Sequence, residues 1–215
     1  MKNSVLYYSV GPLLYCPANH TGIADSLIRE RFGTHYSLAL CLEDTISDSH
    51  VEAAEQQLAA TMEKLCRNLE KQSFFLPKIF VRVRNPVQIA RLMILPGNAS
   101  HLIHGFIIPK FSLKNADSYI EAILSANQNS AKPVYMMPIL EDPSLTDLRT
   151  RHEFLYYLKE KLDSVEPYVL NIRVGGNDLC HMFGFRRHDN ESIHSIRPVA
   201  DIFSDIITVF GMDYV

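Results

Sequence analysis

The chain has 215 residues, of which 47% are hydrophobic and 21% charged, and its net charge is −3. This length suits one domain, and the composition excludes a disordered chain. Nucleic-acid binding is not expected, because no basic field would attract phosphates. No stretch approaches the ~20 apolar residues that cross a bilayer, so no membrane partner is expected. The four cysteines are widely separated and indicate free thiols in the cytoplasm.

The apolar N-terminus, MKNSVLYYSVGPLLYC, is interrupted by Gly11 and Pro12, which favours a first buried strand over a secretory signal. Short apolar runs then alternate with amphipathic stretches. Strands are predicted over residues 13–17, 37–42, 78–85, 103–109, 134–140 and 168–174. Helices are predicted over residues 22–32, 49–69, 116–126 and 198–210. Two further helices are predicted, one that begins at Pro86 and one that ends at about Leu162. Continuous apolar strands flanked by helices indicate a parallel sheet covered on both faces.

Six consecutive strand–helix units favour a TIM (β/α)8-type barrel over a doubly wound sheet. Residues 212–215 look like the start of a seventh strand. A complete barrel needs about 250 residues. We therefore expect residues 1–215 to form a single TIM-barrel domain, truncated at its C-terminus, with six to seven strands. A truncated gene, a longer parent chain, and an oligomer partner that covers the gap are all compatible with the sequence.

Polar side chains gather where the predicted strands end, which is where parallel barrels carry their active sites. In chain order these residues are Asn19, Glu43, Asp44, Arg82, Arg84, Asn85, Lys110, Glu141, Asp142, Asn177 and Asp178. A cluster of carboxylates suits a hard divalent cation, most often Mg²⁺. Arginines beside it suit a substrate that carries a carboxylate, because a guanidinium binds two oxygens at once.

The acidic residues also have a structural interpretation, since acids that follow strands often cap the next helix. Capping is a serious alternative for Asp44, Asp142 and Asp147. It is weaker for Glu141, because Glu is a poor N-cap, whereas Asp178 follows a Gly-Gly turn that suits a cap. Between the two arginines of KIFVRVRN, one is expected to face the barrel interior and the other to pair with a helix carboxylate.

Six motifs occur in order along the chain, each at a predicted strand end. They are LYCPA (14–18), CLEDTI (41–46), VRV (81–83), IPK (108–110), ILE (139–141) and GGNDL (175–179). Together they resemble the citrate lyase β-subunit-like family of the HpcH/HpaI aldolase superfamily, whose pattern is LFVPG, DLED-[GA]-V, VRIN, LPK, ET and G-x-x-D-L. YSLALCLED (36–44) and residues 183–210 look like a branch of this superfamily found in tellurium-resistance gene clusters.

The resemblance implies Mg²⁺, or another divalent cation, held by Glu141 and Asp178. It implies catalytic roles for Arg82, Glu43 and Asp44. Substrate-binding residues are then expected among Arg82, Arg84, Lys110 and Asn19. The chain departs from the family pattern where ET becomes Glu-Asp and where VRIN becomes VRVRN, and the second change leaves the inward arginine open between Arg82 and Arg84.

The activity implied is that of a metal-dependent carbon–carbon lyase, by retro-aldol or retro-Claisen cleavage or the reverse condensation. Its substrate would be a small oxo- or hydroxy-carboxylic acid or a CoA thioester. The metal would stabilise an enolate, and the general base is open among Glu43, Asp44 and a metal-bound water. A homo-oligomer is expected, because C-terminal elements in this family, sometimes from a neighbouring subunit, help complete the site. The alternatives are a phosphoenolpyruvate- or pyruvate-type metal–enolate enzyme on the same barrel and a non-catalytic metabolite-binding member.

Overall fold

The computed structural model describes residues 4–215 and contains a sheet of six parallel strands in the order β1-β2-β3-β4-β5-β6. The strands are β1 (Leu13–Pro17), β2 (Ser37–Cys41), β3 (Ile79–Arg82), β4 (Ile103–Ile108), β5 (Tyr135–Leu140) and β6 (Arg173–Val174). A doubly wound sheet would reverse the strand order partway along. The unbroken order confirms the prediction of an incomplete TIM barrel.

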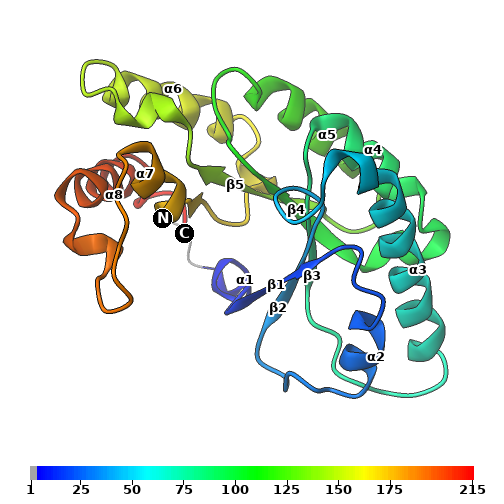
Figure 1. Ribbon diagram of the computed structural model, residues 1–215. Coiled ribbons are helices and arrows are strands. Elements are labelled where there is room, and N and C mark those ends of the chain that lie inside the picture. The colour runs from blue at the N-terminus through cyan, green and yellow to red at the C-terminus, as the bar shows by residue number, and fades with distance from the viewer. Residues whose placement is uncertain (1–3) are drawn as a thin grey trace.

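Helices follow the strands around the outside of the curled sheet (Figure 1). They are α1 (Val5–Tyr8), α2 (Ile23–Ile28), α3 (Val51–Leu69), α4 (Pro86–Ile94), α5 (Ala116–Gln128), α6 (Arg151–Asp163), α7 (Gly176–Met182) and α8 (Arg197–Phe210). Short 3-10 helices are η1 (Asp48–His50), η2 (Gly97–Leu102), η3 (Pro143–Thr146), η4 (Glu166–Tyr168) and η5 (Ile193–Ser195). Within residues 4–215, no helix combines the length and apolar character that a membrane crossing requires.

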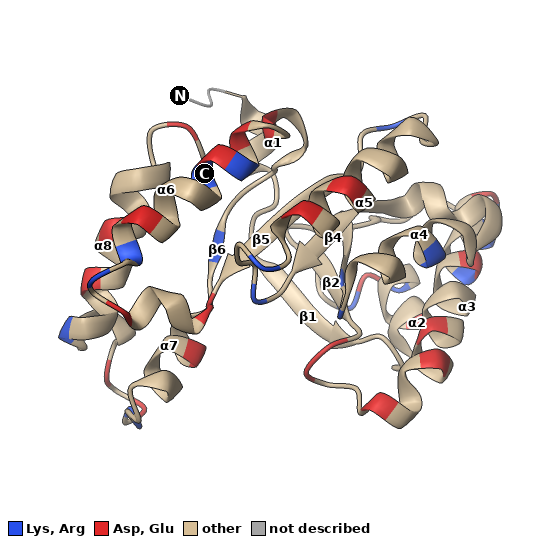
Figure 2. Cartoon of the chain, turned by 90° about the horizontal axis from the view of Figure 1, so that it is seen from above, with Lys and Arg blue, Asp and Glu red and all other residues tan. Residues whose placement is uncertain are grey.

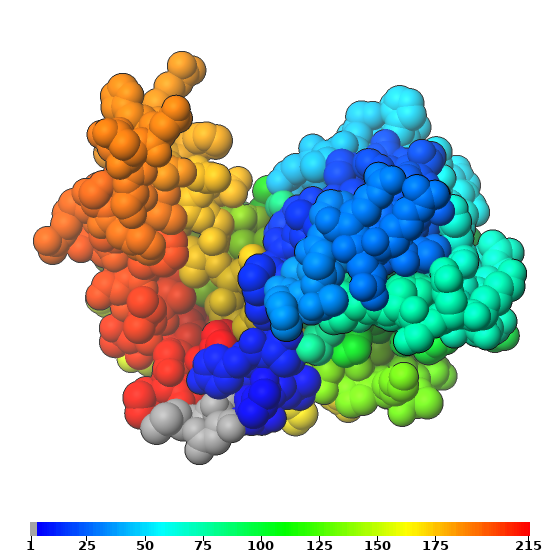
Figure 3. Space-filling model, turned by 90° about the horizontal axis from the view of Figure 1, so that it is seen from below, coloured from blue at the N-terminus to red at the C-terminus, as the bar shows by residue number. Residues whose placement is uncertain are grey.

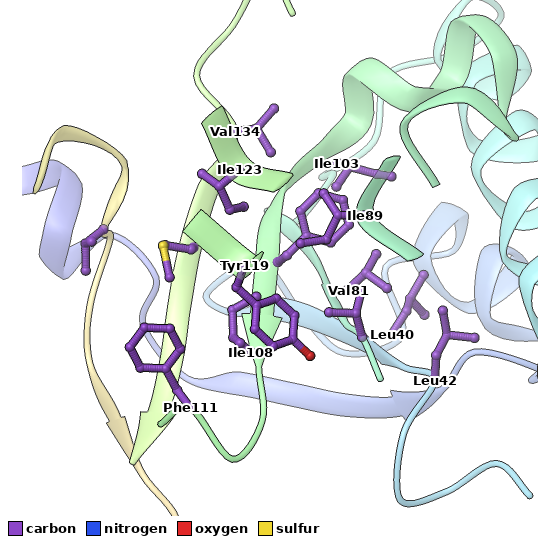
Figure 4. Packing of buried hydrophobic residues seen from close by; sticks show 14 of the residues in the cluster. Leu40, Leu42, Val81, Ile89, Ile103, Ile108, Phe111, Tyr119, Ile123 and Val134 are labelled. Carbon is purple, nitrogen blue, oxygen red and sulfur yellow. The ribbon is translucent and has the colours of Figure 1, made fainter. Parts of the chain in front are cut away.

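Alternate strand residues point outward and form the larger core, between the sheet and the helices. Leu40, Val81 and Ile108 are fully buried there. Figure 4 shows Ile89 and Ile123 packed on this side of the sheet. Full burial of one such side chain stabilises the fold by roughly 1.5–3 kcal/mol. This layer therefore fixes which strand residues are left to point into the barrel.

The inward residues form a smaller second core, which includes Ala39, Phe80, Ile107 and Met137. Helix α1 covers one end of this core, and Leu6, Tyr7 and Val10 pack against it. The Ser37 hydroxyl donates a hydrogen bond to the carbonyl of Val10 at 2.6 Å, and the Lys78 ammonium donates one to the carbonyl of Ser9 at 2.9 Å. The prediction of a strand in the N-terminal segment is thus correct from Leu13 onward. The prediction that this strand is buried is wrong, because only Cys16 of β1 is buried and Tyr15 is exposed at the open edge of the barrel. The residues before Gly11 form a helical cover.

The barrel stays open between β1 and β6. Strand β6 has two residues instead of the predicted seven, and upstream of it only Val169 forms an isolated bridge, to Met136. The predicted seventh strand is not formed at residues 212–215, although the Ile172 N–H donates to the Val215 carbonyl at 2.8 Å. Figure 3 shows a hollow between the N-terminal segment, in blue, and the C-terminal segment, in yellow and orange.

We predict that Gly105→Ala destabilises the fold, because β4 and β5 approach closely at this residue. A Cβ at position 105 would lie 2.2 Å from the Tyr135 carbonyl oxygen, so the strands would have to separate at a cost of roughly 1–3 kcal/mol. Urea-induced unfolding measures the loss. Gly22→Ala is the matched control, since its Cβ would meet the exposed His20 ring at 3.2 Å. Equal losses in both variants would contradict the prediction.

Candidate active site

Strand register turns Arg82, the last residue of β3, toward the barrel interior. Arg82 pairs with Ile107 of β4, an inner-core residue, and neighbouring residues in register share a face of the sheet. Glu141 has the same orientation, because it lies two positions after the inner-core residue Ile139. The ends of β3 and β5 thereby place an arginine and a carboxylate at the same opening of the barrel, the mouth at the C-terminal ends of the strands.

The Arg82 guanidinium is the centre of an ion-pair cluster. Its Nη2 lies 2.5 Å from Glu43 Oε2, 2.9 Å from Asp44 Oδ2 and 3.7 Å from Glu141 Oε1. Burial works to lower the pKa of Arg82, but the charges of Glu43, Asp44 and Glu141 outweigh it and raise this pKa. The guanidinium therefore stays charged although only 13% of the side chain is exposed.

Lys110 joins the cluster through both its side chain and its backbone. Its Nζ lies 2.7 Å from Glu43 Oε1, and its backbone N–H donates to Glu141 Oε1 at 3.0 Å. The hydrogen bond with Glu43 raises the pKa of the ammonium. Lys110 adopts a left-handed backbone conformation with φ 48°, which costs roughly 1 kcal/mol or more for a residue with a Cβ. Asn115 helps to hold this conformation, since its Nδ2 donates to the Lys110 carbonyl at 3.0 Å.

Glu141 is a carboxylate held in a confined space, with only 3% of the residue exposed. A Cβ on Gly175 would lie 2.1 Å from Glu141 Oε2, so only glycine fits at that position. Burial raises the pKa of Glu141 to about 7, and the charges of Asp178 and Glu43 add to the rise against the Lys110 N–H and Arg82. Asp178 lies in the first turn of α7 and, among the described residues, has no hydrogen bond or ion pair through its side chain.

Arg84 lies outside this cluster. Strand β3 ends at Arg82, and the Arg84 guanidinium donates to the carbonyls of Leu42, at 2.7 Å, and of Glu43, at 3.0 Å, and it also contacts Ile46 and Asp48. Arg82 is thus the inward arginine, and Arg84 forms an ion pair with Asp48 of the 3-10 helix η1, as expected for the arginine outside the site. Arg84 also anchors the loop that carries Glu43.

The other predicted residues take different places. Asn19 is exposed in the turn after β1, and no contact joins its side chain to the cluster among residues 4–215. Asp142 is a cap, as its alternative interpretation predicted, since its Oδ1 accepts from the Ser144 N–H at 2.9 Å. Asp147 binds Arg149 on the surface. Asp44 belongs to the cluster, whereas Ser47 takes the cap position of η1.

Two residues that face the barrel interior were not among the predicted site residues. Tyr15 of β1 pairs in register with the inner-core residue Ala39, and Arg173 of β6 pairs with the inner-core residue Ile139. Burial raises the pKa of the Tyr15 hydroxyl, and the nearby positive charge of Arg173 opposes this rise. The alternation of side chains along the strand LLYCP would have indicated that Tyr15 faces inward. The inward position of Arg173 could not be predicted in this way, because it depends on the register of β6.

Figure 2 shows the acidic and basic segments that meet around the strand ends, including the basic segment on β6. The part of the chain that the structure describes contains no group of three or more His, Cys, Asp or Glu side chains arranged to hold a metal ion. Glu141 and Asp178 are therefore a pair of carboxylates beside Arg82. One or two carboxylates are the usual protein share of a Mg²⁺ site, because this ion keeps several waters or substrate oxygens.

Known proteins resemble this chain both in their family and in their fold. A family model described as a C–C bond lyase of the TIM-barrel fold matches residues 4–215. No curated protein sequence matches the chain.

Several solved structures share the fold at low sequence identity. The citrate lyase β subunit from M. tuberculosis, complexed with oxaloacetate and magnesium, is 15% identical, with a TM-score of 0.55 over 97% of this chain and 77% of that chain. Protein CitE from Mycobacterium tuberculosis, in complex with magnesium, acetoacetate and coenzyme A, is 17% identical, with a TM-score of 0.56 over 95% and 63%. The lead(II) complex of Haloferax volcanii malate synthase is 11% identical, with a TM-score of 0.66 over 95% and 59%.

The raised pKa of Glu141 predicts that the metal-free protein loses stability as pH rises. Its carboxyl group titrates at about 7 when folded, against an ordinary value of 4.5. Between these two pH values the folded state holds a proton that the unfolded state has released. The free energy of unfolding therefore falls as pH rises from about 4.5 to about 7, and the contribution of this proton is lost above pH 7. Glu141→Gln removes the titration but still accepts the Lys110 hydrogen bond. In urea titrations with a chelator, the variant should gain roughly 1–3 kcal/mol relative to wild type between pH 5 and pH 8. A difference that does not change with pH would contradict this.

Proposed function

Because the chain belongs to the C–C bond lyase family of the TIM-barrel fold, we propose that its substrate is a small oxo- or hydroxy-carboxylic acid or a CoA thioester of one. The bond broken or formed lies next to the carbonyl group, and Mg²⁺ or another divalent cation is the cofactor. The family match confirms the resemblance inferred from the six strand-end motifs. The magnesium, oxaloacetate, acetoacetate and coenzyme A of the structurally similar proteins support the proposal.

The convergence of Glu43, Arg82, Lys110 and Glu141 at one barrel mouth, with Asp178 beside them, carries this proposal. These side chains come from the ends of β2, β3, β4 and β5 and from the start of α7. They form a cluster of strong charges in contact with one another. A purely structural role would not require four carboxylates and two cations at the open end of the barrel, where functional residues of this fold collect.

The charges of this cluster fit a divalent cation. Four carboxylates (Glu43, Asp44, Glu141 and Asp178) face two cations (Arg82 and Lys110), which leaves an excess of two negative charges. Burial, together with the charges of Asp178 and Glu43, favours the protonated form of Glu141. Arg82 Nε is a buried donor without an acceptor among the described residues. A dication and the oxygens of a bound acid would relieve both conditions.

We assign the two cation ligands to Glu141 and Asp178. Their carboxylates provide the hard oxygens that Mg²⁺ prefers, and Gly175 leaves the room that Glu141 occupies. When bound, the cation supplies Lewis-acid stabilisation of the negative charge that develops on the substrate oxygens as the carbon–carbon bond breaks. The Lys110 N–H and the Arg82 guanidinium, both in contact with Glu141, hold this carboxylate in position.

Arg82 and Lys110 would provide the fixed positive charge for an acidic substrate. Arg82 is restrained by Glu43 and Asp44, so little reorganisation is needed when negative charge develops beside it. The Lys110 side chain is 57% exposed and can reach an anionic group at the rim. Arg84 acts indirectly in this scheme, because it holds the backbone of the loop that presents Glu43.

Of the two carboxylates that are candidates for the general base, Asp44 is the better placed. Both oxygens of Glu43 are engaged, by Arg82 and by Lys110, and its side chain is only 12% exposed. The Asp44 side chain is 55% exposed. Burial opposes ionisation of Asp44, but contact with Glu43 and the charges of Arg82 and Lys110 lower its pKa. Asp44 is therefore ionised at neutral pH and can accept the hydroxyl proton of a substrate.

We also propose that the protein acts in the cytoplasm as a homo-oligomer. Its four cysteines are free, as in proteins of reducing compartments. The unpaired edges of β1 and β6 are surfaces that another copy of the chain would cover.

The proposed cation ligands are tested by Glu141→Gln and Asp178→Asn. Each change keeps the size of the side chain but removes a negative ligand, so we expect Mg²⁺ affinity to fall by at least about tenfold, as measured by isothermal titration calorimetry. Lyase activity should be lost with it.

Asp142→Asn is the matched control, because the new amide still caps η3 through its oxygen and removes a charge next to the site. It should bind Mg²⁺ like wild type. Wild-type affinity in both ligand variants would refute the assignment.

A further inference from the structure

Arg173 is an inward-facing arginine with no carboxylate partner. It lies beside the inner-core residue Ile139 on β6 and is half-buried. Within residues 4–215, no Asp or Glu forms an ion pair with its guanidinium. An arginine that faces the interior of a barrel is normally paired, because removal of its charge from water is expensive. The Arg173 guanidinium thus differs from the strongly paired Arg82.

Tyr15 gives this arginine a polar neighbour on the opposite edge of the open barrel. Tyr15 lies on β1 and Arg173 on β6, the two strands that border the gap. Burial raises the pKa of the Tyr15 hydroxyl, and the positive charges of Arg173 and Arg82 oppose this rise. Since 39% of Tyr15 is exposed, a small ligand in the barrel mouth can reach the pair. The hydroxyl can donate a hydrogen bond to an anion that is bound beside Arg173.

The charge balance of the mouth indicates what this pair would bind. The carboxylate cluster around Arg82 is neutralised by a dication in the proposed function, which leaves Arg173 as an additional positive charge. A substrate with one carboxylate can be bound at the cation. A second carboxylate would need another positive group, and Arg173 is the inward cation that no carboxylate of the described residues pairs with.

The depth of Arg173 sets the length of such a substrate. Val174 pairs with Leu140, so Gly175 lies level with Glu141, and Arg173 is two residues deeper in the barrel. Two residues of a strand span about 6.6 Å. Four- or five-carbon diacids, together with the reach of an arginine side chain, can cover this distance.

We propose that Arg173, assisted by the Tyr15 hydroxyl, binds a second carboxylate of the substrate and makes the enzyme selective for oxo- or hydroxy-diacids. This inference rests on the proposed function, because it places the other end of the substrate at the cation. The Arg173 guanidinium would donate hydrogen bonds to both carboxylate oxygens. The Tyr15 hydroxyl would donate a hydrogen bond to one of them.

Matched acids test the proposal in the presence of Mg²⁺. Oxaloacetate and 2-oxobutanoate have the same carbon chain length but differ by one carboxylate, and so do 2-oxoglutarate and 2-oxopentanoate. By calorimetry, wild type should bind at least one diacid about tenfold more tightly than its monoacid partner. Arg173→Gln should remove most of this preference and leave monoacid and Mg²⁺ affinities within about threefold. Arg173→Lys and Tyr15→Phe should each retain part of the preference.

Arg149→Gln is the control, because Arg149 is 86% exposed and pairs with Asp147 on the surface. It should keep the wild-type preference. An unchanged preference in Arg173→Gln, an equal loss for both acids, or a wild type that does not prefer either diacid would overturn the proposal. If wild type bound neither Mg²⁺ nor any acid, the proposed function would fail with it, whereas normal binding of Mg²⁺ and monoacids would confine the failure to Arg173.

Discussion

The guanidinium of Arg82 lies inside the mouth of the barrel, and its need for negative partners organises the surrounding strand ends. A buried cation is stable only when nearby anions replace its hydration. Glu43 and Asp44 after β2 and Glu141 after β5 supply these anions, and Lys110 links Glu43 to the backbone contact with Glu141. The cluster thus joins the ends of four strands, and this explains why charged residues follow strands whose own residues are almost entirely apolar.

This cluster also connects stability with function. The carboxylates exceed the cations, so the same side chains that stabilise Arg82 attract an additional positive charge. Glu141 contributes to both stability and cation binding. Its burial favours the protonated carboxyl group, and a bound cation would replace that proton. Arg173 adds an inward positive charge at the gap between β6 and β1, and this charge acts on the Tyr15 hydroxyl of β1.

Much of the architecture could be predicted from local sequence. The apolar runs gave β1 at its observed bounds and β5 to within one residue, because each run is continuous and ends at a turn or at polar residues. The motif residues Glu43, Asp44, Arg82, Lys110 and Glu141 do converge at the strand ends. Other features depended on tertiary structure. Helix α1 packs on the inner core at one end of the barrel, and β6 has only two residues at the edge of the sheet. The orientation of Arg84 follows from the end of β3, and that of Arg173 follows from the register of β6.

The central claim is that the charge excess beside Arg82 marks a cation site with Glu141 and Asp178 as its protein ligands. Anomalous X-ray diffraction from crystals that contain Mn²⁺ in place of Mg²⁺ tests this most directly, because it locates the ion without reference to activity. The account predicts one strong peak at about 2.0–2.3 Å from carboxylate oxygens of both residues. A peak bound to neither of these carboxylates, or no peak at saturating Mn²⁺, would contradict it.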